Sequence, residues 1–290
     1  MVANGVRLHV QRLGGTPAPG LGPVGPGGAV CGPVHRGPQP PFVVFIHGLF
    51  VDNMSSLYYS LANPVAAAGC EVLLYDLRGH GRSERTPDGY TMDDSVADLV
   101  GLLDTLGVDR PVHVVGHSFG ASIALRTGLQ HPERVASLVL IEPHIAGSED
   151  GGSWVDDVAD TLTATALSFE QVSVPGDLPG AARRRMRTFQ ATNDFLNATT
   201  LIEDVAAAPP FTEEELSHLV CPTLVVYGEH TDLASSVRAL AMHAPACEIN
   251  VFGGLGHAVL RDACRQVLDL LVPWLERPRE PRADEIERAG

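Results

Sequence analysis

Short apolar runs alternate along the chain with segments whose apolar residues recur at helical spacing. The segment 94–106 places Val96, Leu99, Val100 and Leu103 on one helical face, and a closing helix is expected over 264–275. Near-continuous apolar strands that alternate with helices predict a parallel sheet covered on both faces. The expected strands are "FVVFI" (42–46), "EVLLY" (71–75), "PVHVV" (111–115), "VASLVLI" (135–141), "TLVVY" (223–227) and "EINVF" (248–252).

This alternation stops between residues 144 and 216, where no apolar strand-like run occurs. The segment is made of helix-favouring pieces interrupted by Gly and Pro. We therefore expect a helical cap over 144–216 that lies above one edge of the sheet. It would divide an α/β core into a first part, 1–143, and a second part, 217–290.

The N-terminal region shows two further patterns. Asn4-Gly5 lies between alternating residues and predicts a short hairpin. Residues 14–41 are rich in Gly and Pro, a composition that favours a surface loop over a packed element.

Composition excludes several function classes. The net charge of −15 argues against a nucleic-acid-binding protein, which normally carries a basic face. All 20 cationic residues are arginine, so a P-loop and lysine Schiff-base chemistry are excluded. Because no HExxH or CxxC motif occurs, we expect neither a metal nor a cofactor.

Cysteine usage and hydropathy bear on location. Five cysteines, an odd number without a CxxC pair, favour free thiols in a reducing compartment. No apolar run approaches the roughly 20 residues that span a bilayer, and the N-terminus lacks the pattern of a secretory signal. We expect a cytoplasmic protein with no membrane segment; its oligomeric state stays open.

The strongest chemical signal is "VHVVGHSFGASIAL", in which a strand ends, Gly-His-Ser-Phe-Gly follows, and a helix begins. G-x-S-x-G between a strand and a helix is typical of a nucleophile elbow. We expect Ser118 to be the nucleophile, held on a tight turn at a helix N-terminus. His117 lies within the elbow but is expected to point away from the cleft.

A serine hydroxyl needs a base to become a useful nucleophile. Among the 12 histidines, His257 follows the last strand in "VFGGLGHAVL", where flanking glycines let a loop bend toward Ser118. His113 lies within a strand and is expected to be packed. We therefore predict His257 as the general base.

"FIHGLF" (45–50) follows the first long strand and lies on the same rim of the sheet as Ser118. We expect an oxyanion hole made of two backbone amides, that of Leu49 in this loop and that of Phe119 in the elbow. His47 is expected to order this loop.

Together, "FIHGLF", "DLRGHGRS", "GHSFG", "GEHTD" and "GLGHA" resemble the α/β-hydrolase superfamily in order and spacing over residues 42–275. The resemblance implies an eight-stranded, mostly parallel sheet with a helical cap inserted after the sixth strand. It also implies a triad in the order Ser, acid, His. Epoxide hydrolases and haloalkane dehalogenases of this superfamily carry aspartate at the elbow, which Ser118 disfavours.

Three carboxylates at strand ends are candidates for the acid. The commonest spacing in the family, Gly-x-x-Asp, would select position 231, which is Thr231. A related pattern, Gly-Glu-x-Ser-Asp, selects Asp232, which we favour. Some family members place the acid after the strand that Glu142 follows here, but we interpret Glu142 as a carboxylate at the cap hinge. Glu229 is the weakest candidate.

We expect a serine hydrolase that cleaves an ester or thioester through an acyl-enzyme. "GLFVDNMSSLYYSLANP" and "LIEPH" resemble hydrolases of bacterial polyketide pathways, which suggests a polyketide-type acyl substrate, and "ARRRMR" (182–187) suggests a dock for an acyl carrier protein. The lack of lysine points to a GC-rich bacterial genome. Two alternatives stay open: a lyase or cyclase using the same triad without net hydrolysis, and a non-catalytic ligand-binding protein on the same fold.

Overall fold

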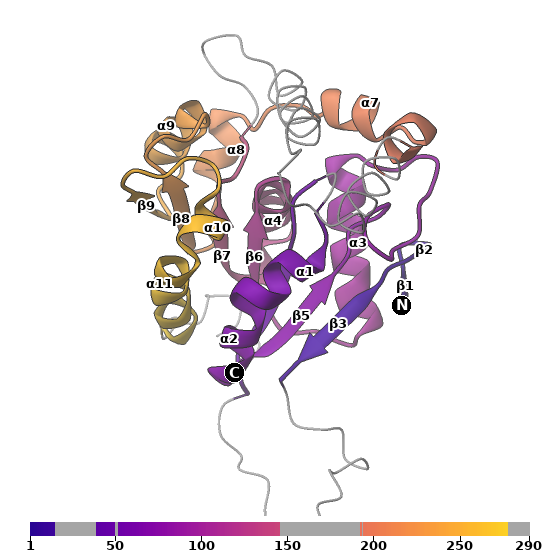
Figure 1. Cartoon of the computed structure of the whole chain (residues 1–290), viewed down its shortest axis with the longest axis horizontal. Coiled ribbons are helices and arrows are strands. Elements are labelled where there is room, and N and C mark those ends of the chain that lie inside the picture. Colours follow the sequence, from indigo (N-terminus) through magenta and orange to yellow (C-terminus); the bar gives the residue numbers. More distant parts are fainter. Residues whose placement is uncertain (15–38, 50–51, 146–191, 193, 278–290) are drawn as a thin grey trace, which may run out of the picture.

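A computed structural model describes residues 1–14, 39–49, 52–145, 192 and 194–277 (Figure 1). Most of the Gly/Pro-rich stretch, the "ARRRMR" segment and most of the expected cap lie outside the described residues. Within the described part of the chain, no helix is both long and apolar enough to cross a bilayer.

The core is a seven-stranded sheet in the order β3-β5-β4-β6-β7-β8-β9. Every neighbouring pair is parallel except β3 with β5, which is antiparallel. The strands are β3 (Val10–Leu13), β4 (Phe42–Ile46), β5 (Glu71–Tyr75), β6 (Val112–His117), β7 (Val135–Ile141), β8 (Thr223–Gly228) and β9 (Cys247–Phe252). The mostly parallel α/β sheet is confirmed, and the apolar runs predicted its parallel strands to within two residues.

The described sheet has seven strands where the resemblance implied eight. The chain before β3 forms a separate two-stranded hairpin, β1 (Val2–Ala3) with β2 (Val6–Arg7). Asn4 and Gly5 both have positive φ, 47° and 75°, so the chain reverses at once and the two strands pair with each other. Figure 1 shows this hairpin beside α3, next to the start of β3.

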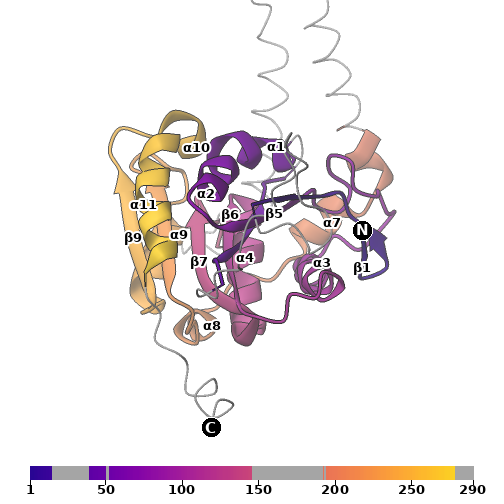
Figure 2. The same ribbon diagram turned by 90° about the horizontal axis from the view of Figure 1, so that it is seen from below.

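Both faces of the sheet are covered by helices, which explains the uninterrupted apolar strands. Along β4, Val44 and Ile46 belong to one buried cluster, whereas Val43 and Phe45 belong to the other. The first cluster lies under α3 (Met92–Thr105), α4 (Phe119–Gln130) and α9 (Ala234–His243); the second lies under α1 (Met54–Leu57), the π-helix η1 (Tyr58–Ala62), α2 (Asn63–Ala67), α10 (Val259–Asp262) and α11 (Cys264–Glu276). Figure 2 shows α1 and α2 on the opposite side of the sheet from α3 and α4. A short turn, η2 (Pro132–Arg134), joins α4 to β7.

The insertion follows β7, the fifth strand of this sheet in chain order, because the sheet has one strand fewer than expected. Its described part is helical and includes α7 (Leu201–Ala206) and α8 (Glu213–Ser217). The division of the chain into core and cap stays a prediction.

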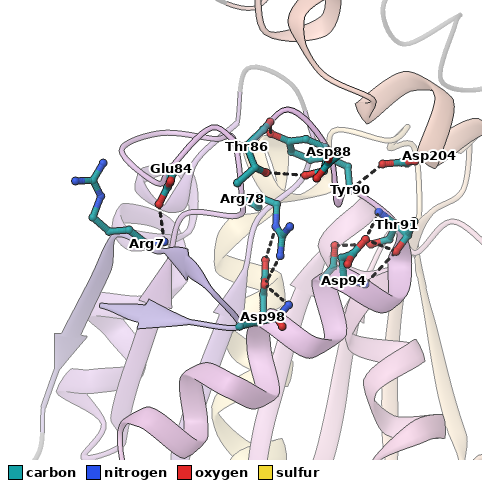
Figure 3. A network of polar contacts seen from close by, with 12 residues as sticks. Arg7, Arg78, Glu84, Thr86, Asp88, Tyr90, Thr91, Asp94, Asp98 and Asp204 are labelled. Carbon is teal, nitrogen blue, oxygen red and sulfur yellow. Dashed lines mark hydrogen bonds and ion pairs between the residues drawn. The ribbon is translucent and has the colours of Figure 1, made fainter.

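Polar contacts hold α7 to the loop that precedes α3 (Figure 3). Asp204 accepts the backbone N–H of Tyr90 at 2.9 Å, one residue before the capping box that Thr91 and Asp94 form at the start of α3. A bidentate pair between Arg78 and Asp98 supports the same loop from below. The described end of the insertion is therefore fixed to the core.

Candidate active site

Ser118 stands between β6 and α4 on a strained backbone, with φ 53° and ψ −121°. Such a conformation is costly for a residue with a side chain and persists only where the surroundings enforce it. A Cβ at Gly116 would lie 2.2 Å from the Gly120 oxygen, and one at Gly120 would lie 2.3 Å from the Ile46 oxygen. Both elbow glycines are therefore required sterically.

The ends of three neighbouring strands are tied together at this point. The N–H of Ser118 donates to the carbonyl of Ile141, the last residue of β7, at 2.8 Å. The N–H of Glu142 donates in turn to Val226 of β8 at 2.9 Å. Ser118 and Glu142 thus leave adjacent strands at the same, carboxyl edge of the sheet.

Glu142 is the second residue of this edge with a strained backbone, at φ 54°, and its side chain is fully buried. Its Oε1 accepts the N–H of Gly228 at 2.6 Å, and its Oε2 accepts the hydroxyl of Thr231 at 2.6 Å. The Nδ1 of His257 lies 3.0 Å from the same Oε2. A carboxylate accepts hydrogen bonds and donates none, so Nδ1 of His257 carries the ring proton. The other ring nitrogen, Nε2, is then able to accept the proton of the nucleophile.

His257 is carried by a loop that packs on the end of β8. A Cβ at Gly228 would lie 2.4 Å from the Leu255 oxygen and 2.5 Å from the Gly256 oxygen, so glycine is needed for this close approach. Glu229, the weakest acid candidate, holds the same loop, because its Oε2 accepts the N–H of Gly254 at 2.8 Å. Its role here is structural support of the His257 loop.

The structure does not bring Asp232 to His257. Asp232 is exposed, and within the described residues it forms no hydrogen bond or ion pair with the imidazole. The expectation of Asp232 as the partner of His257 is corrected in favour of Glu142. The physical reason lies at position 231: Thr231 stands where the commoner acid would stand, and its hydroxyl donates to Glu142.

Three other histidines serve the fold. His47 is fully buried, with Nδ1 directed to the Gly48 carbonyl at 2.7 Å and Nε2 accepting the Leu77 N–H at 2.9 Å, so it orders the loop after β4 as expected. Burial lowers the pKa of His47 and lowers that of His80 to about 3. His113 is buried in β6 with Nδ1 2.8 Å from the hydroxyl of Ser137.

Two further histidines lie beside His257, and the sequence patterns did not predict either of them at this position. The ring centroid of His117 lies 6.2 Å from that of His257, and that of His144 lies 5.8 Å away. The expectation that His117 points away from the site is therefore wrong. Burial lowers the pKa of His144 to about 3, with a smaller effect from the nearby His257.

The predicted oxyanion loop lies against the nucleophile. A Cβ at Gly48 would lie 3.6 Å from the Cβ of Ser118, and Leu49 follows Gly48 directly. Phe119 is the first residue of α4, so its amide lies at a helix N-terminus, where the dipole favours negative charge. This arrangement fits an oxyanion hole from Leu49 and Phe119.

The sequence model of the family described as "alpha/beta hydrolase fold" matches residues 41–244. Lipase LipV of Mycobacterium tuberculosis is 36% identical over 165 residues, which cover 55% of this chain and 49% of the lipase. The sn-1-specific diacylglycerol lipase ABHD11 of Mus musculus is 27% identical, covering 81% of both chains. The chain spans about half the length of the M. tuberculosis lipase and 42% of the Danio rerio form of ABHD11.

Solved structures share the fold at low sequence identity. The enol-lactonase of Burkholderia xenovorans LB400 superposes with a TM-score of 0.66 at 20% identity, covering 95% of this chain and 98% of the lactonase. A thermophilic esterase from Thermogutta terrifontis gives 0.67 at 20% identity, covering 93% of each chain.

Proposed function

The chain belongs to the α/β-hydrolase family, and from this premise we propose that it is a cofactor-free serine hydrolase that cleaves carboxylic esters or thioesters. The observation that carries the proposal is the hydrogen bond between the buried Glu142 and the half-buried His257, at the strand edge where Ser118 is held in a strained elbow. Strained, non-glycine backbone at two neighbouring strand ends is typical of functional sites.

Each residue has a defined step. Ser118 attacks the acyl carbon while Nε2 of His257 takes the hydroxyl proton, and Glu142 stabilises the imidazolium through Nδ1. The amides of Leu49 and Phe119 hold the negative oxygen of the tetrahedral intermediate. His257 then protonates the leaving alcohol or thiol. A water molecule that His257 deprotonates next releases the acid from Ser118.

The ester class is supported by the similar proteins, which include lipases, an esterase and an enol-lactonase; a lactone is an internal ester. The finer substrate, a polyketide-type or carrier-bound acyl group, is proposed on the sequence resemblance alone. A series of acyl p-nitrophenyl esters and acyl-thioesters of increasing chain length would define it.

The test of the function is covalent labelling together with turnover. A fluorophosphonate should modify Ser118, and Ser118→Ala should abolish both labelling and ester hydrolysis, whereas the exposed Ser217→Ala in α8 should match the native chain. Turnover in ¹⁸O-water should place one label in the acid product. Unlabelled product would contradict hydrolysis and support the lyase or cyclase alternative.

A further inference from the structure

Asp52, which follows the predicted oxyanion loop, has a position that no step of the proposed mechanism uses. Its side chain is 20% exposed and lies at the carboxyl edge of the sheet, near the elbow. Its Oδ2 accepts the N–H of Gly48 at 2.9 Å, and its Oδ1 accepts the N–H of Asn53 at 2.8 Å. One carboxylate therefore joins the residue before Leu49 to the start of α1.

The same Oδ2 also faces the elbow. It lies 4.0 Å from Nδ1 of His117, the residue before Ser118, and 3.3 Å from where a Cβ would stand on Gly48. Burial would raise the pKa of the Asp52 carboxyl, but the nearby His117 ring and the Gly48 amide hold that pKa below its ordinary value. Asp52 is therefore an ionised acceptor, which makes a stronger hydrogen bond to an amide than a neutral group does.

We propose that Asp52 is the positioning residue of the oxyanion loop: by accepting the Gly48 amide beside His117, it fixes the direction of the next amide, that of Leu49, over Ser118. This inference rests on the proposed function. An oxyanion donor works only if it is held in place before charge develops, since reorganisation during the reaction would cost part of its stabilisation. Asp52 touches no reacting atom and acts through the Gly48–Leu49 backbone.

The proposal separates transition-state from ground-state effects. Asp52→Ala should lower kcat roughly 10- to 100-fold, because one oxyanion donor is worth about 10²–10³ and would be loosened, not removed. It should weaken a trifluoromethyl ketone, which forms an oxyanion on Ser118, by the same factor and change KM less than about threefold. Asp52→Asn, which keeps an oxygen that can accept the Gly48 N–H, should lose less than Asp52→Ala.

The measurements are kcat and KM on the best p-nitrophenyl ester and the inhibition constant of the ketone, all per active site titrated with fluorophosphonate. Asp109→Asn is the matched control, since Asp109 is exposed before β6 at the amino edge of the sheet. If Asp52→Ala does not fold, Asp52→Ser replaces it, because serine is too short to reach Gly48.

Three results would overturn the inference: native kcat and ketone affinity in Asp52→Ala or Asp52→Ser, a fall in kcat without loss of ketone affinity, or equal losses in the Asn and Ala variants. The proposed function fails separately, if Ser118→Ala retains hydrolysis. Loss of hydrolysis in Ser118→Ala together with a native Asp52→Ala would reject the positioning role and keep the hydrolase.

Discussion

Glu142 and His257 lie 115 residues apart in sequence and are joined by a hydrogen bond of 3.0 Å between Oε2 and Nδ1. The carboxylate is fully buried and the imidazole side chain is 40% exposed, so the pair runs from the protein interior to the open edge of the sheet. This is the arrangement that an acid orienting a catalytic base requires.

Glu142→Gln should therefore lower kcat by about three to four orders of magnitude and leave KM within a few-fold, because the amide neither stabilises the imidazolium nor fixes its tautomer. Asp232→Asn should retain most of the native kcat, since Asp232 is exposed and unpaired with His257 among the described residues. Steady-state kinetics of the two purified variants decide the matter. The reverse pattern, an inactive Asp232→Asn and an active Glu142→Gln, would identify Asp232, in the loop after β8, as the acid.

The contrast between these carboxylates shows what the sequence could and could not predict. Ser118 and His257 are marked by local patterns, a glycine-flanked turn and a glycine-rich loop after a strand. The acid was placed by spacing after β8, but Glu142 follows a different strand, and its positive φ leaves no local pattern in "VLIEP". The strands could be predicted because burial on both faces leaves long apolar runs in the sequence. Asp52 could not, because its hydrogen-bond partners are backbone amides, which leave no pattern of residue types.

Thr231 should matter through its hydroxyl. It donates to Oε2 of Glu142 at 2.6 Å, on the same oxygen that contacts His257. Thr231→Val keeps the volume and removes the donor, so kcat should fall by roughly 10- to 150-fold, which corresponds to about 1.5–3 kcal/mol for a hydrogen bond to a charged group. Thr231→Ser should stay close to native in the same assay. Equal losses in both variants would point to packing of the threonine methyl instead.

The fold should begin to lose stability in mild acid, at pH values higher than those at which most carboxylates titrate. The pKa values of His80 and His144 are lowered to about 3 by burial, so between about pH 6.5 and 3 the unfolded chain binds protons that the native chain does not. Stability is therefore lost as pH falls through this window, by about 1.4 kcal/mol per pH unit and group at most. Denaturant unfolding between pH 7 and 5 measures this slope.

His80→Gln removes one of these groups and should give a shallower dependence of unfolding free energy on pH than the native chain. The exposed His218→Gln serves as the matched loss of a surface histidine and should keep the native slope. An unchanged slope in His80→Gln would mean that His80 is protonated in the native state, against its burial beside His47 and Phe195.

Gly228 should be the most sensitive glycine for the placement of His257. A Cβ there would meet the carbonyl oxygens of Leu255 and Gly256 at 2.4 and 2.5 Å, and both belong to the loop that carries the base. Gly228→Ala must push this loop away from β8, which lengthens the contact of His257 with Glu142 and weakens the amide of residue 228 as a donor to the same carboxylate. We expect kcat to fall at least 100-fold, because small misplacements of catalytic groups are costly.

Gly253→Ala, in the same loop, is the matched control, because its Cβ would only approach Glu229 to 3.8 Å and its backbone does not need positive φ. It should keep native kcat with a similar melting temperature. Fluorophosphonate labelling of Ser118 in Gly228→Ala should slow in parallel with kcat, since both reactions need His257 as base. Native labelling with impaired turnover would instead show that the loop shift acts after acylation, on the water that His257 deprotonates.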